Sequence, residues 1–337
     1  MFSFKNDYAE GCHPELLKML IDTNMSQQEG YGDDDFSELA RTRIMQHLQC
    51  NADIHFVSGG TQANTVLLAA ALKPFESVIA AESAHINVHE AGAIEATGHK
   101  IEYAATPDGK LTPELIAPLL IKAEDHHMVK PRLVYISQST ELGTVYKLSE
   151  MEALSAFCRS NNLLLYADGA RMGAALTSPA ADFTLADMAR LFDAFYIGGT
   201  KNGALLGEAI VLLNPDLKRD FLFHLKQRGA LLSKGRLAGS QFAALFSNNL
   251  FFDLARHSNA MALEMAAAIA KAGYPFFAQP ESNQIFPVLP MTLIHELSKE
   301  FGFYIWRKTD DNNAIIRLVT SWATPQSEVE RFVDYIQ

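Results

Sequence analysis

Short apolar segments alternate with helix-like segments through the middle of this chain, and this pattern restricts the fold more than any other feature. Strands that are apolar along their whole length must be buried on both faces, so with helices between them they predict a mainly parallel sheet covered on both sides. The short connection over 203–207 predicts that the last strand runs antiparallel to its predecessor. The seven candidate strands are 54–57, 77–81, 100–104, 132–137, 163–167, 193–198 and 208–213.

Helices are predicted between these strands, and the pattern changes after residue 236. The intervening helices are 62–72, 85–97, 112–124 and 149–161, several of them bounded by typical start and stop residues. The C-terminal part has a long helical stretch, 236–271, with Asn248-Asn249 as an interruption, then strands 284–288, 303–306 and 314–319 and helices 291–300 and 326–336. We expect a three-layer α/β large domain with an N-terminal arm over 1–240, and a smaller α+β domain over 241–337.

Charge and cysteine content limit the partners and the compartment. The net charge of −11 argues against binding to a nucleic-acid backbone. Three cysteines are too few for a disulfide framework and favour a reducing compartment. The N-terminal residues lack an apolar leader, and no stretch of about 18 apolar residues is present to span a bilayer. We expect a soluble cytoplasmic protein without a membrane partner.

An acid and an amine follow two neighbouring candidate strands. Asp168, in Asp-Gly-Ala-Arg, ends the strand 163–167, and Lys201 follows the strand 193–198. Pyridoxal phosphate needs this pair, because an amine forms the Schiff base and a carboxylate keeps the pyridine nitrogen protonated. Each residue alone has an ordinary explanation, Asp168 as a helix cap and Lys201 as a surface lysine.

A glycine-rich segment supplies a third part. Gly59-Gly60-Thr61-Gln62-Ala63-Asn64 follows the strand 54–57 and opens an apolar helix. The first N–H groups of a helix, together with its positive end, can bind a phosphate. Gly60 and Thr61 are therefore the predicted phosphate-binding residues, and the three segments together indicate a pyridoxal phosphate site.

Several segments, taken in order, resemble the threonine aldolases, which belong to the aspartate-aminotransferase-like group of pyridoxal phosphate enzymes. The resemblance extends from about residue 5 to the C-terminus. Its segments are EGYGDD at 29–34, GGTQAN at 59–64, SAHINVHEAG at 83–92, DGAR at 168–171, Lys201 after its strand, and IRLVT at 316–320.

The resemblance implies roles for individual residues. Lys201 would hold the cofactor, and His85 would lie over its ring and help to orient or deprotonate the substrate hydroxyl. Arg317 and Arg171 would bind the substrate carboxylate, for which the planar guanidinium is well suited. Lys234 is a weaker candidate for the cofactor phosphate, with Arg236 beside it, because basic residues of a neighbouring subunit do this in the family.

The chain departs from the family at three places. The usual serine-lysine-glycine is Thr200-Lys201-Asn202, and a serine that contacts the carboxylate is replaced by Asn6. Gln138-Ser-Thr-Glu141 stands where the family has asparagine-threonine-histidine. The first two changes leave the reacting groups in place, but together they bear on substrate preference and on reaction type.

No metal site is expected. Glu124-Asp125-His126-His127 contains ligand-type residues, but adjacent side chains of an extended segment point to opposite faces, so a polar loop is the preferred interpretation.

The resulting hypothesis is a lyase that cleaves L-threonine or L-allo-threonine to glycine and acetaldehyde. Two alternatives remain open: a β-eliminating lyase acting on another amino acid, and a non-catalytic relative or phosphate-ligand binding protein. A homodimer or homotetramer with shared active sites is expected, with the phenylalanine-rich segment 242–252 as a source of apolar contact.

Overall fold

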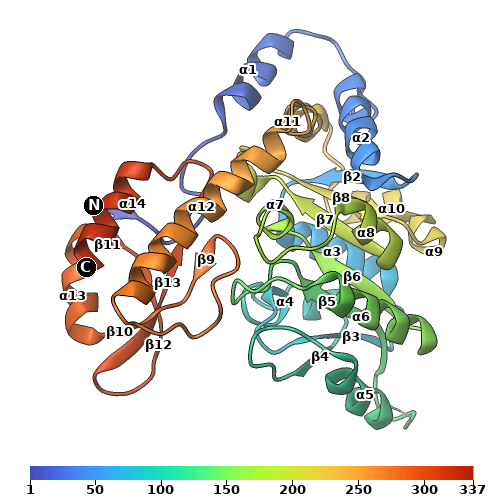
Figure 1. Cartoon of the computed structure of the whole chain (residues 1–337). Coiled ribbons are helices and arrows are strands. Elements are labelled where there is room, and N and C mark those ends of the chain that lie inside the picture. Colours follow the sequence, from blue (N-terminus) through green and yellow to red (C-terminus); the bar gives the residue numbers. More distant parts are fainter. Residues whose placement is uncertain (124, 337) are drawn as a thin grey trace.

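The largest sheet contains all seven of the predicted strands. The computed structural model describes residues 1–123 and 125–336, and its main sheet has the strand order β2-β8-β7-β6-β5-β3-β4 (Figure 1). The strands are β2 (Asp53–Val57), β3 (Glu76–Ala81), β4 (Ile101–Ala104), β5 (Lys130–Ser137), β6 (Leu164–Asp168), β7 (Ala194–Gly198) and β8 (Glu208–Leu212).

The sheet is mainly parallel, as predicted. The pairs β3–β4, β3–β5, β5–β6 and β6–β7 are parallel, whereas β8 runs antiparallel to both β7 and β2. The connection into β8 turns at Gly203 and Gly207, whose φ angles of 95° and 125° favour glycine. Every residue of β3, β6, β7 and β8 is buried, which explains why these strands have no polar face.

Helices cover both faces of the sheet. On one side α2, α8, α6 and α5 contact one another in series, and on the other side α10 contacts α3. In Figure 1, α6 and α8 lie in front of the sheet. These helices are α2 (Asp35–Leu48), α3 (Gly60–Ala71), α5 (Pro113–Lys122), α6 (Leu148–Ser160), α8 (Leu185–Leu191) and α10 (Phe221–Gln227).

The predicted helix over 85–97 is wrong. The structure has one helical turn, α4 (His85–Val88), and a separate 3-10 turn, η1 (Glu95–Thr97). Between them Ala91 and Gly92 have φ angles of 50° and 74°, and two successive left-handed residues cannot continue a right-handed helix.

The predicted long helix is interrupted where the sequence indicates. Asn248 and Asn249 have φ angles of 50° and 66° and separate α11 (Arg236–Leu245) from α12 (Leu250–Lys271).

Within residues 1–123 and 125–336, no helix has both the length and the hydrophobicity that a membrane span requires. The remaining helical elements before residue 236 are α1 (Pro14–Thr23), α7 (Met172–Leu176), η2 (Thr200–Asn202) and α9 (Pro215–Lys218).

The C-terminal part forms a separate small sheet with two helices against it. β13 pairs with β10, β12 and β9, all antiparallel. The predicted strand 284–288 is two short strands, because Pro287 between them has no N–H to donate to a ladder. The elements are β9 (Gln284–Ile285), β10 (Val288–Pro290), α13 (Met291–Glu300), β12 (Tyr304–Lys308), β13 (Asn313–Val319) and α14 (Gln326–Ile336).

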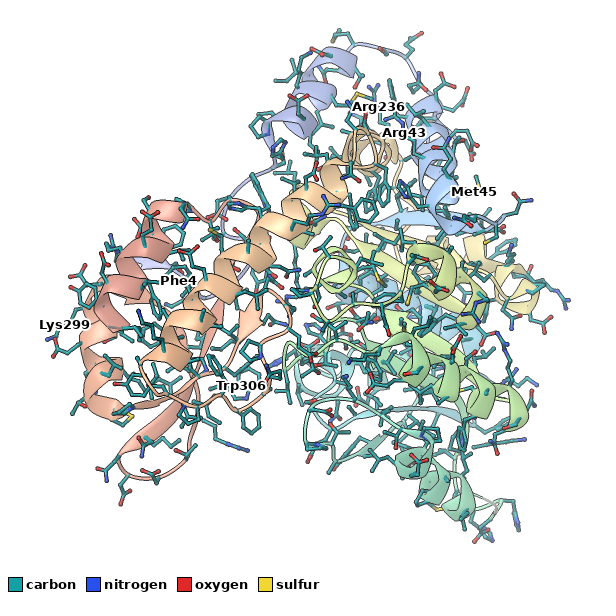
Figure 2. The ribbon with its side chains drawn as sticks, viewed as in Figure 1. Phe4, Arg43, Met45, Arg236, Lys299 and Trp306 are labelled. Atoms are coloured by element: carbon teal, nitrogen blue, oxygen red, sulfur yellow. The ribbon has the colours of Figure 1, made fainter. Side chains whose placement is uncertain are left out.

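The N-terminal arm packs against the C-terminal sheet and helices. β1 (Phe2–Ser3) pairs in parallel with β11 (Phe301–Gly302), and Phe4 is fully buried in the second of two hydrophobic clusters (Figure 2). Further along the arm, the His13 N–H donates to the Gly203 carbonyl at 2.9 Å. The arm therefore connects the C-terminal cluster to the loop that follows Lys201.

The two hydrophobic clusters meet within α12. The first extends to Leu254 on this helix, and the second begins at Met261. Because one helix contributes to both clusters, the packing does not place a boundary at residue 240, and that boundary stays a prediction.

Phe4 should be essential for anchoring the arm. Its ring lies 5.0 Å from that of Phe2, 5.7 Å from Phe301 and 5.9 Å from Phe332, between ring centroids. Phe4→Ala should lower the free energy of unfolding by about 3–5 kcal/mol, through lost burial and the cavity left behind. Thermal unfolding followed by circular dichroism would measure this.

Phe75→Ala is the matched control, because this side chain is 57% exposed and should change stability little. Equal effects of the two substitutions would contradict the anchoring role of Phe4.

Candidate functional site

The carboxyl ends of β5, β6 and β7 bring the predicted acid and amine to one edge of the sheet. Asp168 is the last residue of β6 and pairs with Ser137 at the end of β5. Lys201 lies in η2, three residues after β7 ends. In open α/β sheets this edge is where ligands bind.

Asp168 is a buried carboxylate held by three side-chain donors and by the backbone N–H of Ala170, which donates at 3.0 Å. Tyr135 donates to it at 2.6 Å, Asn64 at 3.0 Å, and Tyr196 also donates to it. Burial alone would raise the pKa of Asp168, but the charge of His85 and these hydrogen bonds outweigh burial and hold the pKa below its ordinary value. Asp168 is therefore ionised at neutral pH.

Asn64 and Glu90 connect Asp168 to His85. Asn64 donates to both Asp168 and Glu90, the latter at 2.8 Å, and accepts from the Tyr166 hydroxyl at 2.8 Å. His85 Nδ1 lies 2.9 Å from Glu90 Oε1. Burial opposes the charged imidazolium, but the hydrogen bond to Glu90 and the charges of Glu141 and Asp168 prevail and raise the pKa of His85.

The start of α3 offers free backbone donors beside this network. Gly59 is extended, Gly60 opens the helix, and Thr61 is exposed. The first N–H groups of a helix lack intrahelical partners and can bind an anion. A Cβ on Gly60 would lie 2.8 Å from the Tyr196 hydroxyl, so glycine allows this helix end to approach the Asp168 network closely.

The amine of Lys201 lies among charged groups. Burial lowers its pKa and Arg171 lowers it further, while Asp7, Glu141 and Asp168 raise it, and the net change is downward. A lowered pKa increases the fraction of the neutral amine, which is the nucleophilic form.

Glu208, at the start of β8, is a second carboxyl group near Lys201. It accepts from the Gly199 N–H at 2.9 Å, and burial raises its pKa to about 8. It is therefore largely protonated at neutral pH.

Arg171 is held by Asp7 from the N-terminal arm. Its Nε and Nη2 donate to the two Asp7 oxygens at 2.7 and 3.1 Å, and both side chains are buried. Asn283 donates to Asp7 at 2.9 Å. Asp7 thus occupies one edge of the guanidinium and leaves Nη1 without a hydrogen bond to the described residues.

Arg317, on β13, faces the same region from the C-terminal part. Its Nε and Nη2 donate to Gln284 Oε1 at 3.2 and 2.8 Å, and its guanidinium lies 5.9 Å from the ring centroid of Trp306. Burial, and then the charge of Arg171, lower its pKa. The positive charges of the two guanidinium groups repel each other, and an anion bound between them would relieve this repulsion.

Asn6 is partly buried next to Asp7, and its side-chain oxygen accepts from the Tyr8 N–H at 3.0 Å. Lys234 is exposed in the loop before α11. Within residues 1–123 and 125–336, no hydrogen bond or ion pair joins Lys234 to the sheet edge. Arg236 donates to backbone carbonyls of Thr23 and Ser26, so in this chain it holds the loop after α1.

The expectation that adjacent side chains diverge around residue 126 is wrong. The ligand atoms of Asp125, His126 and His127 lie within 4.8 Å of one another, because this segment is a turn and not extended chain. All three are exposed, and Glu124 lies outside the described residues.

Several residues of the site were not predicted from the sequence. Asn64 ends the GGTQAN motif, and Tyr135 and Tyr196 lie within apolar strands. A buried tyrosine normally has a hydrogen-bond partner for its hydroxyl. A tyrosine within an apolar strand therefore indicates a buried polar group nearby, and this signal was available for Tyr135 and Tyr196. Asp7 and Glu90 carry no such signal, because their partners are distant in sequence.

Comparison with known proteins gives consistent results. The profile of the beta-eliminating lyase family matches residues 9–291. The low-specificity L-threonine aldolase of Pseudomonas aeruginosa is 34% identical over 335 residues, covering 97% of this chain and 94% of that protein. The Escherichia coli K12 enzyme of the same name is 29% identical over 272 residues, covering 79% of this chain and 78% of that protein.

Solved structures agree with the sequence relatives. A threonine aldolase structure from Leishmania major is 47% identical, with a TM-score of 0.98, and covers 100% of this chain and 98% of that one. Aspartate aminotransferase from Thermus thermophilus has a TM-score of 0.72 at 12% identity, covering 99% of this chain and 89% of that one. The latter similarity concerns the fold alone.

The Asp7–Arg171 pair should contribute to stability in a pH-dependent way. Asp7→Asn leaves Arg171 buried without a counter-charge and should cost about 3–5 kcal/mol at neutral pH. Burial alone would raise the pKa of Asp7, but Arg171 and Lys201 hold it below its ordinary value. This contribution is therefore present above a pH of about 4 and lost as pH falls through the lower folded pKa.

The melting temperatures of the wild type and Asp7→Asn, measured from neutral to acid pH, should converge on the acid side. Glu152→Gln, which removes an exposed pair with Arg190, should cost less than about 1 kcal/mol. A difference between wild type and Asp7→Asn that does not change with pH would contradict this account.

Proposed function

The chain belongs to the threonine aldolases of the beta-eliminating lyase family, and we propose that it cleaves L-threonine and L-allo-threonine to glycine and acetaldehyde with pyridoxal phosphate as cofactor. The observation that carries this proposal is the sheet edge at which an ionised, buried Asp168 and the amine of Lys201 follow neighbouring parallel strands.

The residues present fit that cofactor. Gly60 and Thr61 would hold its phosphate at the start of α3. Asp168 would hold a proton on its pyridine nitrogen, and Lys201 would bind its aldehyde carbon covalently through the neutral amine. When bound, pyridoxal phosphate supplies an electron sink conjugated to Cα of the substrate.

Orientation of the substrate decides which bond at Cα breaks. A bond breaks readily only when it stands perpendicular to the plane of the electron sink, so the carboxylate must be fixed. Arg317 and the free Nη1 of Arg171 are the proposed carboxylate-binding groups, with Asn6 beside them. The ion pair with Asp7 supports this role, because it fixes the plane of Arg171 before a substrate arrives.

His85 has a narrower role than the sequence alone allowed. Its raised pKa favours the imidazolium, which donates hydrogen bonds but cannot accept a proton. We therefore assign His85 to packing over the cofactor ring and to donating a hydrogen bond, with Glu90 orienting the imidazole.

A homodimer or homotetramer in the cytoplasm is proposed, with Lys234 reaching the cofactor phosphate of a neighbouring subunit. The segment 242–252 was predicted to supply an apolar subunit contact. Phe242, Phe246 and Phe251 do not support that prediction, because they are buried in this chain's own core. Exposed apolar side chains that could take this part include Leu17 and Ile21 on α1, Met25 just after it, and Leu222 and Phe223 on α10.

β-Elimination is the second candidate, because the family profile carries that name and the same cofactor residues would serve it. The products distinguish the two reactions. The protein should release glycine and an aldehyde from threonine and phenylserine, whereas pyruvate and ammonia from serine or cysteine would reject the aldolase proposal.

Lys201→Ala should abolish both cleavage and the visible absorbance of bound cofactor. The loss in kcat should exceed about 10²–10⁴-fold, the contribution of a positioned proton-transfer group alone. Lys299→Ala, at an exposed lysine on α13 (Figure 2), is the control and should behave like the wild type. A wild-type protein that stays colourless with added cofactor would favour a non-catalytic relative.

A further inference from the structure

Glu141 is a carboxylate at the sheet edge whose role remains to be assigned. It lies in the loop that follows β5, in the segment where this chain departs from the threonine aldolase pattern. It is partly buried and lines a small cavity together with Ser83 and Tyr135. Tyr135 is one of the donors to Asp168, so Glu141 borders the centre of the site.

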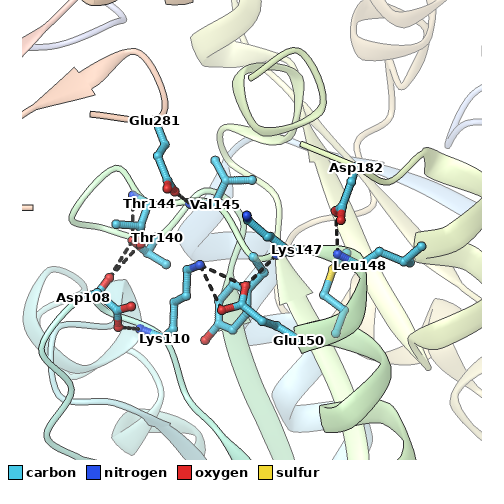
Figure 3. Close-up of polar contacts among 12 residues, drawn as sticks. Asp108, Lys110, Thr140, Thr144, Val145, Lys147, Leu148, Glu150, Asp182 and Glu281 are labelled. Atoms are coloured by element: carbon cyan, nitrogen blue, oxygen red, sulfur yellow. Dashed lines mark hydrogen bonds and ion pairs between the residues drawn. The ribbon is translucent and has the colours of Figure 1, made fainter. Parts of the chain in front are cut away.

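The loop that carries Glu141 is held firmly on both sides (Figure 3). The Thr140 and Thr144 hydroxyls lie 2.7 Å apart, and Thr144 donates to the Asp108 carbonyl at 2.7 Å. The Val145 N–H donates to Glu281 at 2.7 Å. The loop on either side of Glu141 is therefore held in place before a ligand binds.

The charge of Glu141 acts on the cationic and imidazole groups of the site. Its negative charge favours the protonated form of each group, and so contributes to raising the pKa. The net pKa is raised at His85 and Arg171. At Lys201, His89 and Arg317, burial and other charges outweigh Glu141 and the net pKa is lowered. Within residues 1–123 and 125–336, the Glu141 carboxylate has no hydrogen-bond donor and no ion pair at 4.0 Å or less. A carboxylate without a donor is available to accept a hydrogen bond from the substrate.

The other side chains of the edge are less suited to accept a proton. His85 is biased toward the imidazolium, and Arg171 and Arg317 have no acceptor atom. Lys201 is committed to the cofactor. His89 is the remaining candidate, but its side chain is exposed and packs against Trp306 at 6.3 Å between ring centroids.

We propose that Glu141 is a catalytic residue that accepts the proton of the substrate β-hydroxyl as the Cα–Cβ bond breaks. The O–H bond breaks toward Glu141, the carbonyl of the aldehyde forms, and the electron pair of the Cα–Cβ bond remains with Cα, stabilised by the bound cofactor. A proton then returns to Cα, so that glycine and the aldehyde together contain every atom of the substrate. This inference rests on the proposed aldolase function.

The test compares two reactions of the cofactor-loaded protein. Glu141→Gln keeps the size of the side chain but cannot accept the proton, so kcat/KM for L-threonine should fall by about 10²–10⁴-fold. Exchange of the glycine α-proton with deuterium, followed by NMR, should stay within a few-fold of wild type, because glycine has no hydroxyl. The visible spectrum of bound cofactor and the thermal midpoint should also be unchanged.

Glu152→Gln, an exposed glutamate on α6, is the matched control and should retain both reactions. Formate added to Glu141→Ala should restore part of the cleavage, because a small carboxylate can take the place of the lost one.

Three outcomes would overturn the inference. They are a Glu141→Gln variant that cleaves threonine like wild type, a variant in which cleavage and glycine exchange fall together, and loss of cleavage in His89→Asn but not in Glu141→Gln. Failure of the proposed function appears differently, since the wild type itself would then exchange glycine protons but release no aldehyde from threonine.

Discussion

The buried carboxylate of Asp168 is the interaction on which the rest of the site depends. A charge in a protein interior is costly unless it is paired and hydrogen-bonded. Here Tyr135, Tyr196 and Asn64 donate to it, and His85 provides a nearby positive charge. These partners come from β5, β7, α3 and α4, so the requirement to stabilise one charge fixes the relative positions of four elements. The close approach of α3 in turn requires a glycine at residue 60.

The second organising feature is the connection between the two hydrophobic clusters through charged groups. Phe4 anchors the N-terminal arm in the C-terminal cluster, and Asp7 on the same arm pairs with Arg171, which lies between β6 and α7. Asn283, from the C-terminal part, completes this contact. Arg317 reaches the site from β13, so the proposed carboxylate-binding groups come from both the large sheet's connections and the C-terminal sheet. Any relative movement of the clusters would therefore alter how a substrate is oriented.

The strands and the main motifs were predictable because their signals are local. A fully buried strand must be apolar along its length, and the carboxyl ends of parallel strands meet at one edge, so Asp168 and Lys201 were expected near each other. The helix predicted over 85–97 failed because Ala91 and Gly92 adopt left-handed conformations that apolar periodicity does not reveal. Asp7 was missed because its partner Arg171 is 164 positions away, and no local pattern records such a pairing.

The amino-acid sequence by itself determined the parallel sheet, the glycine-rich helix start at residue 60 that we propose for a phosphate, the acid and the amine at the sheet edge, and the two candidate arginines. These follow from hydrophobic patterning and from residue types at strand ends, which are properties of short segments. Only the tertiary structure decided which groups are charged and which are already occupied. Asp168 is ionised, the pKa of His85 is raised, Arg171 is half-engaged by Asp7, and Glu141 has no hydrogen-bond donor among residues 1–123 and 125–336. Burial and electrostatic pairing decide these states, because they depend on neighbours that the fold brings together from distant parts of the chain.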